Sequence, residues 1–418
     1  MTKIRERLAT LALVFACLAL TLAGEGPMLH DPDFHLRALS VNTAFDFGGW
    51  TLEALASKAA DGLLAPQRFM DDTTRSKFVL RYLDKVSEAQ ELTETIDARY
   101  TDFTVTDPAA ASAAQQQALS DLRREIAACA PLAEAILGEQ VSQVLGDDAF
   151  GLLDQLFPPV SGTVTPLPYV LNISPRDHID KIYQEELEVG LTAAPQEALE
   201  SEIEEALPKL SAYVAPIGGL SAYPAMLLEN PSIDWLADVM AHEWTHHYLL
   251  SAPLGWDYSN SSEARTINET TASLMGEWAG QEVVRRFYAP LLEREKPLPD
   301  PLTRDVEEET PHFDYRGEMY RTRVAVDLLL MVGKVEEAEW YMEMQRRNFI
   351  LNGYSLRRLN QAYFSFHGAY ANRAGASGSD PGGPAVRRLW ALSASPRDFV
   401  RQVSRTTTLA ELRAMLGE

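Results

Sequence analysis

Two histidines and a glutamate have the residue types and the spacing that a catalytic zinc site needs. They lie in the run His242-Glu243-Trp244-Thr245-His246. On a helix, residues four apart stand on the same face about one turn from each other, so both imidazoles can bind one ion at roughly 2.0 to 2.1 Å. Glu243 is displaced around the helix from this pair. We therefore expect Glu243 to act on a water molecule as general base rather than to bind the metal.

The segment that must position this motif is predicted to be a helix over residues 232–250. Ser232 is a favourable N-cap residue, Pro253 stops the helix from continuing, and neither Gly nor Pro interrupts the segment. His247 follows the motif directly, but its side chain points away from that of His246. We expect His247 to support the site or to lie at the surface rather than to be a ligand.

A catalytic zinc ion has three protein ligands and keeps its fourth position open for water. The motif, together with the pair Asn268-Glu269, resembles the gluzincin metallopeptidases, the thermolysin-like clan. In that clan an Asn-Glu pair on the next active-site helix supplies the third ligand, so the resemblance implies that Glu269 completes the site. Asp257, Glu263 and Glu277 remain the alternative third ligands.

The resemblance covers residues 231–280 and implies a Glu-bound zinc with an active-site helix under a small sheet. The chain departs from the clan at Ser273, where an acidic or amide residue often orients a ligand histidine, because a hydroxyl accepts such a hydrogen bond more weakly. Leu249 and Ala252 occupy the positions where metzincins have Gly and His, so a third histidine ligand is disfavoured. No GxMEN-like amine-recognition motif is present, which weakens an aminopeptidase assignment.

Peptide hydrolysis also needs a hydrogen-bond donor for the oxyanion that develops on the substrate. Residues 360–370 offer His367 and Tyr370, beside Tyr363, in a setting of aromatic and small residues. The same pattern is typical of an aromatic core helix, which is the structural alternative. A second, weaker set of candidates is His312, Tyr315 and Tyr320.

The N-terminal third of the chain is predicted to be helical. Apolar residues at helical spacing indicate two or three amphipathic helices in residues 30–100. A polar, alanine-rich stretch at residues 101–117 is typical of a linker or loop, and the helix that follows, through residues 122–141, is expected to break or kink at Pro131. Prolines become frequent near residue 160, and we place a domain boundary there.

Two short strands are predicted after this boundary, at residues 169–173 and 212–217. Pro216 limits the second strand to the edge of a sheet. An edge strand just before the metal-binding helix is where a peptidase needs a partner for the extended backbone of its substrate. Further along the chain, the apolar spacing of residues 318–347 predicts one long amphipathic helix.

Composition limits the class of partner and the kind of metal site. The 418 residues carry a formal net charge of −23 at pH 7. Such a chain repels phosphates and offers no basic stripe, which argues against a nucleic-acid partner. Cys17 and Cys129 are the only cysteines, so neither a disulfide framework nor a multi-cysteine zinc site can be drawn. Any metal must be bound by His and carboxylate side chains.

The N-terminus has the layout of a secretory signal or a signal anchor. Three basic residues precede an uncharged, apolar run at residues 8–24. The cue for cleavage is poor, so we expect an uncleaved anchor that holds the protein at a membrane with its catalytic domain outside the cytoplasm. If the segment is cleaved, the protein is secreted. Bulky Phe15, two residues before Cys17, argues against a lipoprotein.

These observations predict an α+β, mostly helical protein. Its parts are a signal anchor or signal peptide over residues 1–24, a helical region over residues 25–160, and a zincin-like metallopeptidase domain with a small antiparallel sheet over residues 161–418. The predicted function is a Zn²⁺-dependent peptidase that hydrolyses a peptide or protein substrate with Glu243 as general base. Two other functions stay open: a zinc hydrolase of a non-peptide amide, and an anchored scaffold or binding protein with a structural metal site.

Overall fold

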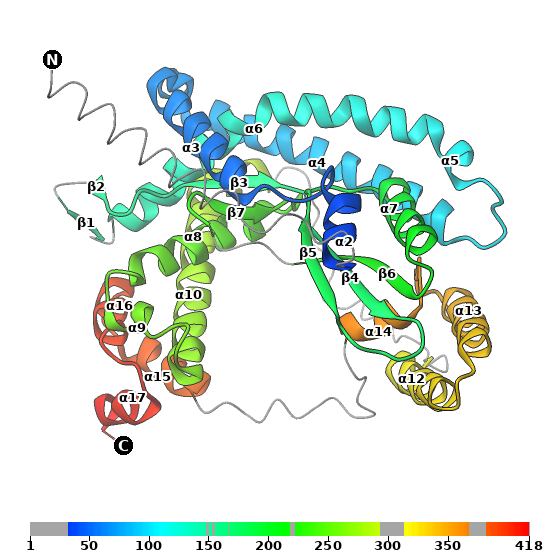
Figure 1. Cartoon of the computed structure of the whole chain (residues 1–418). Coiled ribbons are helices and arrows are strands. Elements are labelled where there is room, and N and C mark those ends of the chain that lie inside the picture. Colours follow the sequence, from blue (N-terminus) through cyan, green and yellow to red (C-terminus); the bar gives the residue numbers. More distant parts are fainter. Residues whose placement is uncertain are drawn as a thin grey trace, which may run out of the picture.

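The computed structural model describes residues 32–147, 150–152, 155–166, 168–217, 222–292, 313–367 and 382–417. Within these residues the protein is mostly helical, with a small antiparallel sheet and a small parallel sheet (Figure 1). The predicted α+β, mostly helical class is therefore confirmed. A further pair of very short strands consists of β1 (Gly151–Leu152) and β2 (Gln155–Leu156).

The N-terminal part consists of helices, as its apolar periodicity predicts. They are α2 (Pro32–Ser40), α3 (Phe47–Leu64), the 3-10 turn η1 (Pro66–Phe69), α4 (Asp72–Thr101), α5 (Pro108–Ala111) and α6 (Ala113–Asp147). The loop predicted at residues 101–117 is shorter than expected, because Pro108 begins α5 and α6 already starts at Ala113.

Helix α6 continues through Pro131 instead of ending there. A proline inside a helix removes one backbone hydrogen bond. Ile126 and Ile136, one on each side of Pro131, are buried in the same apolar cluster as the residues of α4. This burial on both sides keeps the two halves of α6 in one helix.

The antiparallel sheet has helices on both of its faces. β4 (Tyr169–Pro175) lies between β5 (Tyr183–Leu187) and β6 (Leu210–Pro216). Among the described strands β6 pairs only with β4, so it is the edge strand that Pro216 predicts. Alternate residues of a strand point to opposite faces. Helices α2 and α7 (Ala193–Ala206) cover one face of the sheet. The three helices that follow residue 313 cover the other face.

Residues 318–347 lie in two helices, so the prediction of one long helix is wrong. α12 (Tyr315–Met331) and α13 (Val335–Leu351) are separated at Gly333, and the short helix α14 (Gln361–His367) follows. Gly333 has a φ of 74°, in the left-handed region that favours glycine and ends helices.

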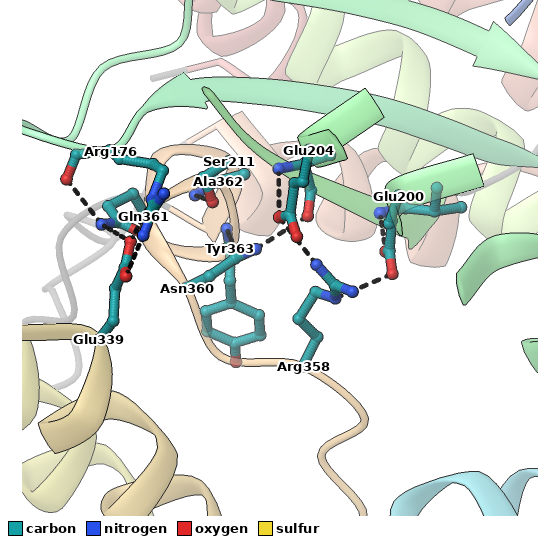
Figure 2. A network of polar contacts seen from close by, with 12 residues as sticks. Arg176, Glu200, Glu204, Ser211, Glu339, Arg358, Asn360, Gln361, Ala362 and Tyr363 are labelled. Carbon is teal, nitrogen blue, oxygen red and sulfur yellow. Dashed lines mark hydrogen bonds and ion pairs between the residues drawn. The ribbon is translucent and has the colours of Figure 1, made fainter. Parts of the chain in front are cut away.

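A polar network joins the start of α14 to the sheet and to α7 (Figure 2). Asn360 donates through Nδ2 to the backbone carbonyl of Ala212 in β6 at 2.8 Å. Arg358 pairs with Glu200 and Glu204 of α7 at 2.9 and 2.8 Å. The segment that leads into α14 is therefore fixed to two other elements.

A second group of elements surrounds the motif from His242 to His246. β3 (Gly162–Thr165) and β7 (Ala225–Leu228) form a parallel pair, and β7 leads into α8 (Ile233–Leu249), then α9 (Pro253–Trp256) and α10 (Ser262–Val283). The remaining elements are the π-helical turn η2 (Val284–Tyr288), α11 (Ala289–Leu292), α15 (Gly382–Leu392), α16 (Pro396–Val403) and α17 (Leu409–Leu416).

The largest apolar cluster joins the N-terminal helices to the helices around the motif. It contains Val86 of α4, Ile136 of α6, Met240 of α8, Met275 of α10 and Val386 of α15, all of them fully buried. Both parts of the chain thus share one core. The domain boundary near residue 160 stays a prediction.

The predicted membrane-anchored location needs a correction. In the part of the chain that the structure describes, no helix is both long and apolar enough to cross a membrane. The predicted anchor, residues 8–24, lies outside the described residues. The structure gives membrane anchoring no support, and we do not include it in the function proposed below.

Candidate metal centre

Helix α8 is the predicted metal-binding helix, and its sequence explains its orientation. Ser232 caps it by accepting a hydrogen bond from a backbone N–H one turn later. Trp244 is buried on the core side of the helix. His242, Glu243 and His246 are half-buried and line a cavity of about 580 Å³.

Two glycines of α10 let it approach α8 closely just before the motif. A Cβ added at Gly276 would lie 2.2 Å from Asp238 Oδ1 and 3.1 Å from His242 Cβ. A Cβ at Gly280 would lie 2.8 Å from the backbone nitrogen of Asp238. The contacts of 2.2 and 2.8 Å with Asp238 are too short for a real Cβ atom, so the two glycines allow the helices to come near enough to share one site.

The donor atoms of His242, His246 and Glu269 converge on one point. The two Nε2 atoms are 3.0 Å apart, and Glu269 Oε2 lies 3.7 Å from the first and 3.6 Å from the second. In a tetrahedral zinc site with bonds near 2.05 Å, neighbouring ligand atoms are about 3.4 Å apart. The observed separations lie on both sides of that value. The donor set therefore fits a zinc ion.

The other carboxylates considered from the sequence do not join this group. Within the described residues, the group of His, Cys, Asp and Glu atoms close enough to hold a metal contains Glu269 alone as carboxylate. Asp257 is the C-cap residue of α9, and the carboxylate of Glu263 accepts a hydrogen bond from the backbone N–H of Leu409 at 2.9 Å. Glu277 belongs to α10 but not to the group.

Asn268 fixes the orientation of His246. Its Nδ2 donates to the carbonyl of Leu254 at 3.4 Å, which leaves Oδ1 to accept from His246 Nδ1 at 2.7 Å. A proton on Nδ1 leaves the lone pair of Nε2 free to bind a metal. Asn268 is buried, 2% exposed, so this arrangement is shielded from water.

Tyr258 also belongs to the site, although no pattern in the sequence indicated it. Its hydroxyl donates to Glu269 Oε1 at 2.5 Å, and its ring contacts that of His246 at 5.9 Å between centroids. Ser273 does not take the orienting role considered for it, because its hydroxyl donates to the backbone carbonyl of Glu269 at 2.8 Å on its own helix. The residue that orients His246 is instead Asn268.

The charges of the site support one another. Interactions with His242 and His246, aided by the hydrogen bond from Tyr258, hold the pKa of the Glu269 carboxyl well below its usual range. Burial lowers the pKa of His246, but the Glu269 carboxylate, together with Glu243 and Asn268, outweighs this effect and the net shift is upward. The hydrogen bond to Glu269 also raises the pKa of Tyr258 to about 12. Burial raises the pKa of Asp238, partly offset by His242.

Glu243 faces the cavity beside the three donors. Among the described residues, its carboxylate takes part in no hydrogen bond or ion pair, so it is available to a water molecule or a substrate. The cavity is lined by apolar as well as polar side chains. Its apolar residues are Met226 and Leu228 of β7, Trp235, Val239 and Leu250.

His247 is not part of the donor group. Its Nε2 lies 2.9 Å from the backbone carbonyl of Ala222, and its ring packs edge-on against Tyr223 at 5.0 Å. Burial lowers the pKa of His247, partly offset by the hydrogen bond to Ala222. His247 therefore ties α8 to the segment that leads into β7.

The predicted oxyanion residues are not brought to this cavity by the described contacts. His367 ends α14 and contacts Tyr363 and Tyr213, with 3.5 Å between its Nε2 and the Tyr213 hydroxyl. Figure 1 shows α14 beneath β4 and β6, apart from α8 and α10. Tyr370 lies outside the described residues, so its predicted role stays a prediction.

The weaker set of oxyanion candidates does not line the cavity either. The hydroxyl of Tyr315 lies 3.2 Å from that of Tyr363, and Tyr320 is 37% exposed on α12. His312 lies outside the described residues. The sequence thus predicted the three residues whose donor atoms converge, and the donor for an oxyanion stays unassigned.

Comparison of the chain with protein-family models, with curated proteins and with solved structures finds no match.

Proposed function

We propose that this protein is a zinc-dependent peptidase, with His242, His246 and Glu269 as metal ligands and Glu243 as general base. The observation that carries the proposal is the set of separations of 3.0, 3.7 and 3.6 Å between the three donor atoms. The fold proposed for this region is zincin-like, with the active-site helix next to a small sheet. The gluzincin resemblance of the motif supports the same assignment.

The chemistry follows from the three donor side chains and from Glu243 beside them. A zinc ion bound there would supply Lewis acidity, which polarises a carbonyl oxygen and lowers the pKa of water. Glu243 takes the proton from the attacking water and passes it to the leaving amine, so that one peptide bond and one water give a carboxylate and an amine. Asn268 keeps His246 in the tautomer that leaves Nε2 unprotonated.

The position of strand β7 favours a peptide substrate over a compact one. Within the described residues β7 pairs only with β3, and its residues Met226 and Leu228 line the cavity. Its other edge can pair with an extended backbone through main-chain hydrogen bonds. The strand expected from the sequence to have this role, at residues 212–217, belongs to the other sheet as β6.

The first test measures bound zinc and hydrolysis of a peptide library with the full-length protein. We expect near-stoichiometric zinc in the wild type and in Glu243→Gln, and loss of zinc in His246→Ala and Glu269→Ala. Glu243→Gln should lose hydrolysis by about 100-fold or more, because it keeps the shape of the side chain but cannot accept a proton. Glu277→Gln, on α10 but outside the donor group, is the matched control.

The alternatives are separated by the same set of proteins. Zinc content without cleavage of any peptide or amide would replace the peptidase with a scaffold that holds a structural metal. Cleavage of N-acylated amino sugars but not of peptides would replace it with a hydrolase of non-peptide amides. A wild-type protein that binds no zinc would end the proposal.

A further inference from the structure

The two oxygens of Glu269 have different partners. Oε2 faces the Nε2 atoms of His242 and His246, at 3.7 and 3.6 Å. Oε1 accepts the hydrogen bond from the Tyr258 hydroxyl at 2.5 Å. The carboxylate is therefore presented to the metal position through one oxygen, while the second oxygen is held by the protein.

Tyr258 reaches this position from a short segment that we call the α9 turn, residues 253–258. The turn fits closely behind α8, because a Cβ added at Gly255 would lie 2.2 Å from the backbone oxygen of Leu249. The carbonyl of Leu254 accepts the hydrogen bond from Asn268 that sets the orientation of that amide.

The C-terminal helices support the same turn from outside. The backbone N–H of Leu254 donates to the carbonyl of Ser404, just after α16, at 3.2 Å. Leu254 is itself fully buried in the main apolar cluster. The α9 turn is thus fixed on one side by α8 and on the other by residues about 150 positions later in the chain.

We propose that Tyr258 is a positioning residue of the metal site, and that the α9 turn holds the side chains of two of the three ligands in place before the metal binds. The turn acts on Glu269 through the hydroxyl of Tyr258 and on His246 through Leu254 and Asn268. This inference rests on the proposed function, since it takes His242, His246 and Glu269 as metal ligands. It adds a residue and a segment to which neither the motif nor the clan resemblance assigned a role.

The physical consequence is an effect on metal affinity. A carboxylate that is free to rotate must lose that freedom when it binds an ion, whereas a carboxylate already held by a hydrogen bond has lost it during folding. Partners of this kind change metal affinity by about 10- to 100-fold in other proteins. Removal of the Tyr258 hydroxyl leaves the ring contacts with His246 and Arg265 in place. Tyr258→Phe therefore isolates the hydrogen bond.

The experiment compares full-length wild type, Tyr258→Phe and Tyr248→Phe. Tyr248 is the matched control because it lies on α8 but packs its ring against Trp244 and Phe150. The dissociation constant for Zn²⁺ is measured by competition with a chelating dye, and the visible spectrum is recorded with Co²⁺ in the same site. The thermal midpoint without metal shows whether each variant is folded.

We expect Tyr258→Phe to bind Zn²⁺ about tenfold more weakly and to change the Co²⁺ spectrum, with an unaltered thermal midpoint. Tyr248→Phe should match the wild type in all three measurements. Zinc binding by Tyr258→Phe within about twofold of the wild type, with the same Co²⁺ spectrum, would overturn the positioning role alone. A wild-type protein that binds neither ion would overturn both this inference and the proposed function.

Discussion

Asn268 links His246 to the α9 turn through the oxygen and the nitrogen of its side-chain amide. The Nδ2 group is committed to Leu254, so only the oxygen is left for His246. A buried amide cannot exchange these partners for water. The tautomer of His246 is therefore set by a residue that does not touch the metal position.

Replacing Asn268 with alanine should weaken zinc binding about 10- to 100-fold, because His246 Nδ1 then lacks its acceptor. The same chelator competition measures the effect. Ser273→Ala serves as control, since the Ser273 hydroxyl bonds only to the backbone of its own helix. Equal zinc affinity in Asn268→Ala and wild type would contradict this role.

The contact between α8 and α10 shows how the elements build the site. Each helix supplies only part of the donor set, and neither can hold a catalytic zinc alone. Gly276 and Gly280 allow the two backbones to meet at Asp238, one turn before His242. The distance between the helices is therefore decided by the absence of two side chains.

Gly276→Ala should separate the helices and reduce the free energy of unfolding by about 1 to 3 kcal/mol, because the added Cβ overlaps Asp238. It should also weaken zinc binding. Gly62→Ala, in helix α3 with no atom within 4 Å of an added Cβ, is the control. Gly62→Ala should leave stability unchanged or slightly raised, because alanine loses less chain entropy than glycine in a helix. Chemical denaturation of both variants measures the difference, and an unchanged Gly276→Ala would be the contrary result.

Across the whole molecule, a buried charge cluster joins α7, β6 and the start of α14. The side chain of Glu200 is 0% exposed, and Arg357 bonds to both of its oxygens, at 2.6 and 2.7 Å. Arg358 and the backbone N–H of Val214 also bond to Glu200. A buried carboxylate needs all of these partners, because water cannot replace them.

Arg357→Met should lower the free energy of unfolding by about 3 kcal/mol, because it leaves the charge of Glu200 buried and only partly compensated. Arg285→Met is the matched control, since Arg285 pairs with Glu282 at the surface, where water screens the pair. We expect a far smaller change there. Urea denaturation measures the free energy of unfolding of both variants. Equal decreases would show that the cluster around Glu200 contributes no more to stability than a surface ion pair.

Metal binding should stabilise the molecule as a whole, since it ties together α8 and α10, which share the main core. When free zinc exceeds its dissociation constant about 100-fold, the gain is about 2.7 kcal/mol. A rise in the thermal midpoint on adding zinc, reversed by a chelator and lost in His246→Ala, is the expected result. An equal rise in His246→Ala would place the binding elsewhere.

Local geometry explains what could be predicted from the sequence. Two histidines four apart on a capped helix must share a face, so α8, its two donors and the neighbouring Glu243 could be predicted without any other part of the chain. The strand at residues 169–173 also follows from a short, mostly apolar run, and the edge position of residues 212–217 follows from the placement of Pro216. Gly333 was present in the sequence as a signal for the break between α12 and α13, but the long apolar periodicity hid it.

Tertiary packing decided the rest. Asp257, Glu263, Glu269 and Glu277 are equivalent as residue types, and only the approach of α10 to α8 places Glu269 at the donor point. Tertiary packing also decided three other features. Helix α6 continues through Pro131, β7 rather than β6 lies beside the cavity, and His367 lies beside Tyr213. These outcomes depend on contacts between segments far apart in the chain, and periodicity along the sequence carries no information about such contacts.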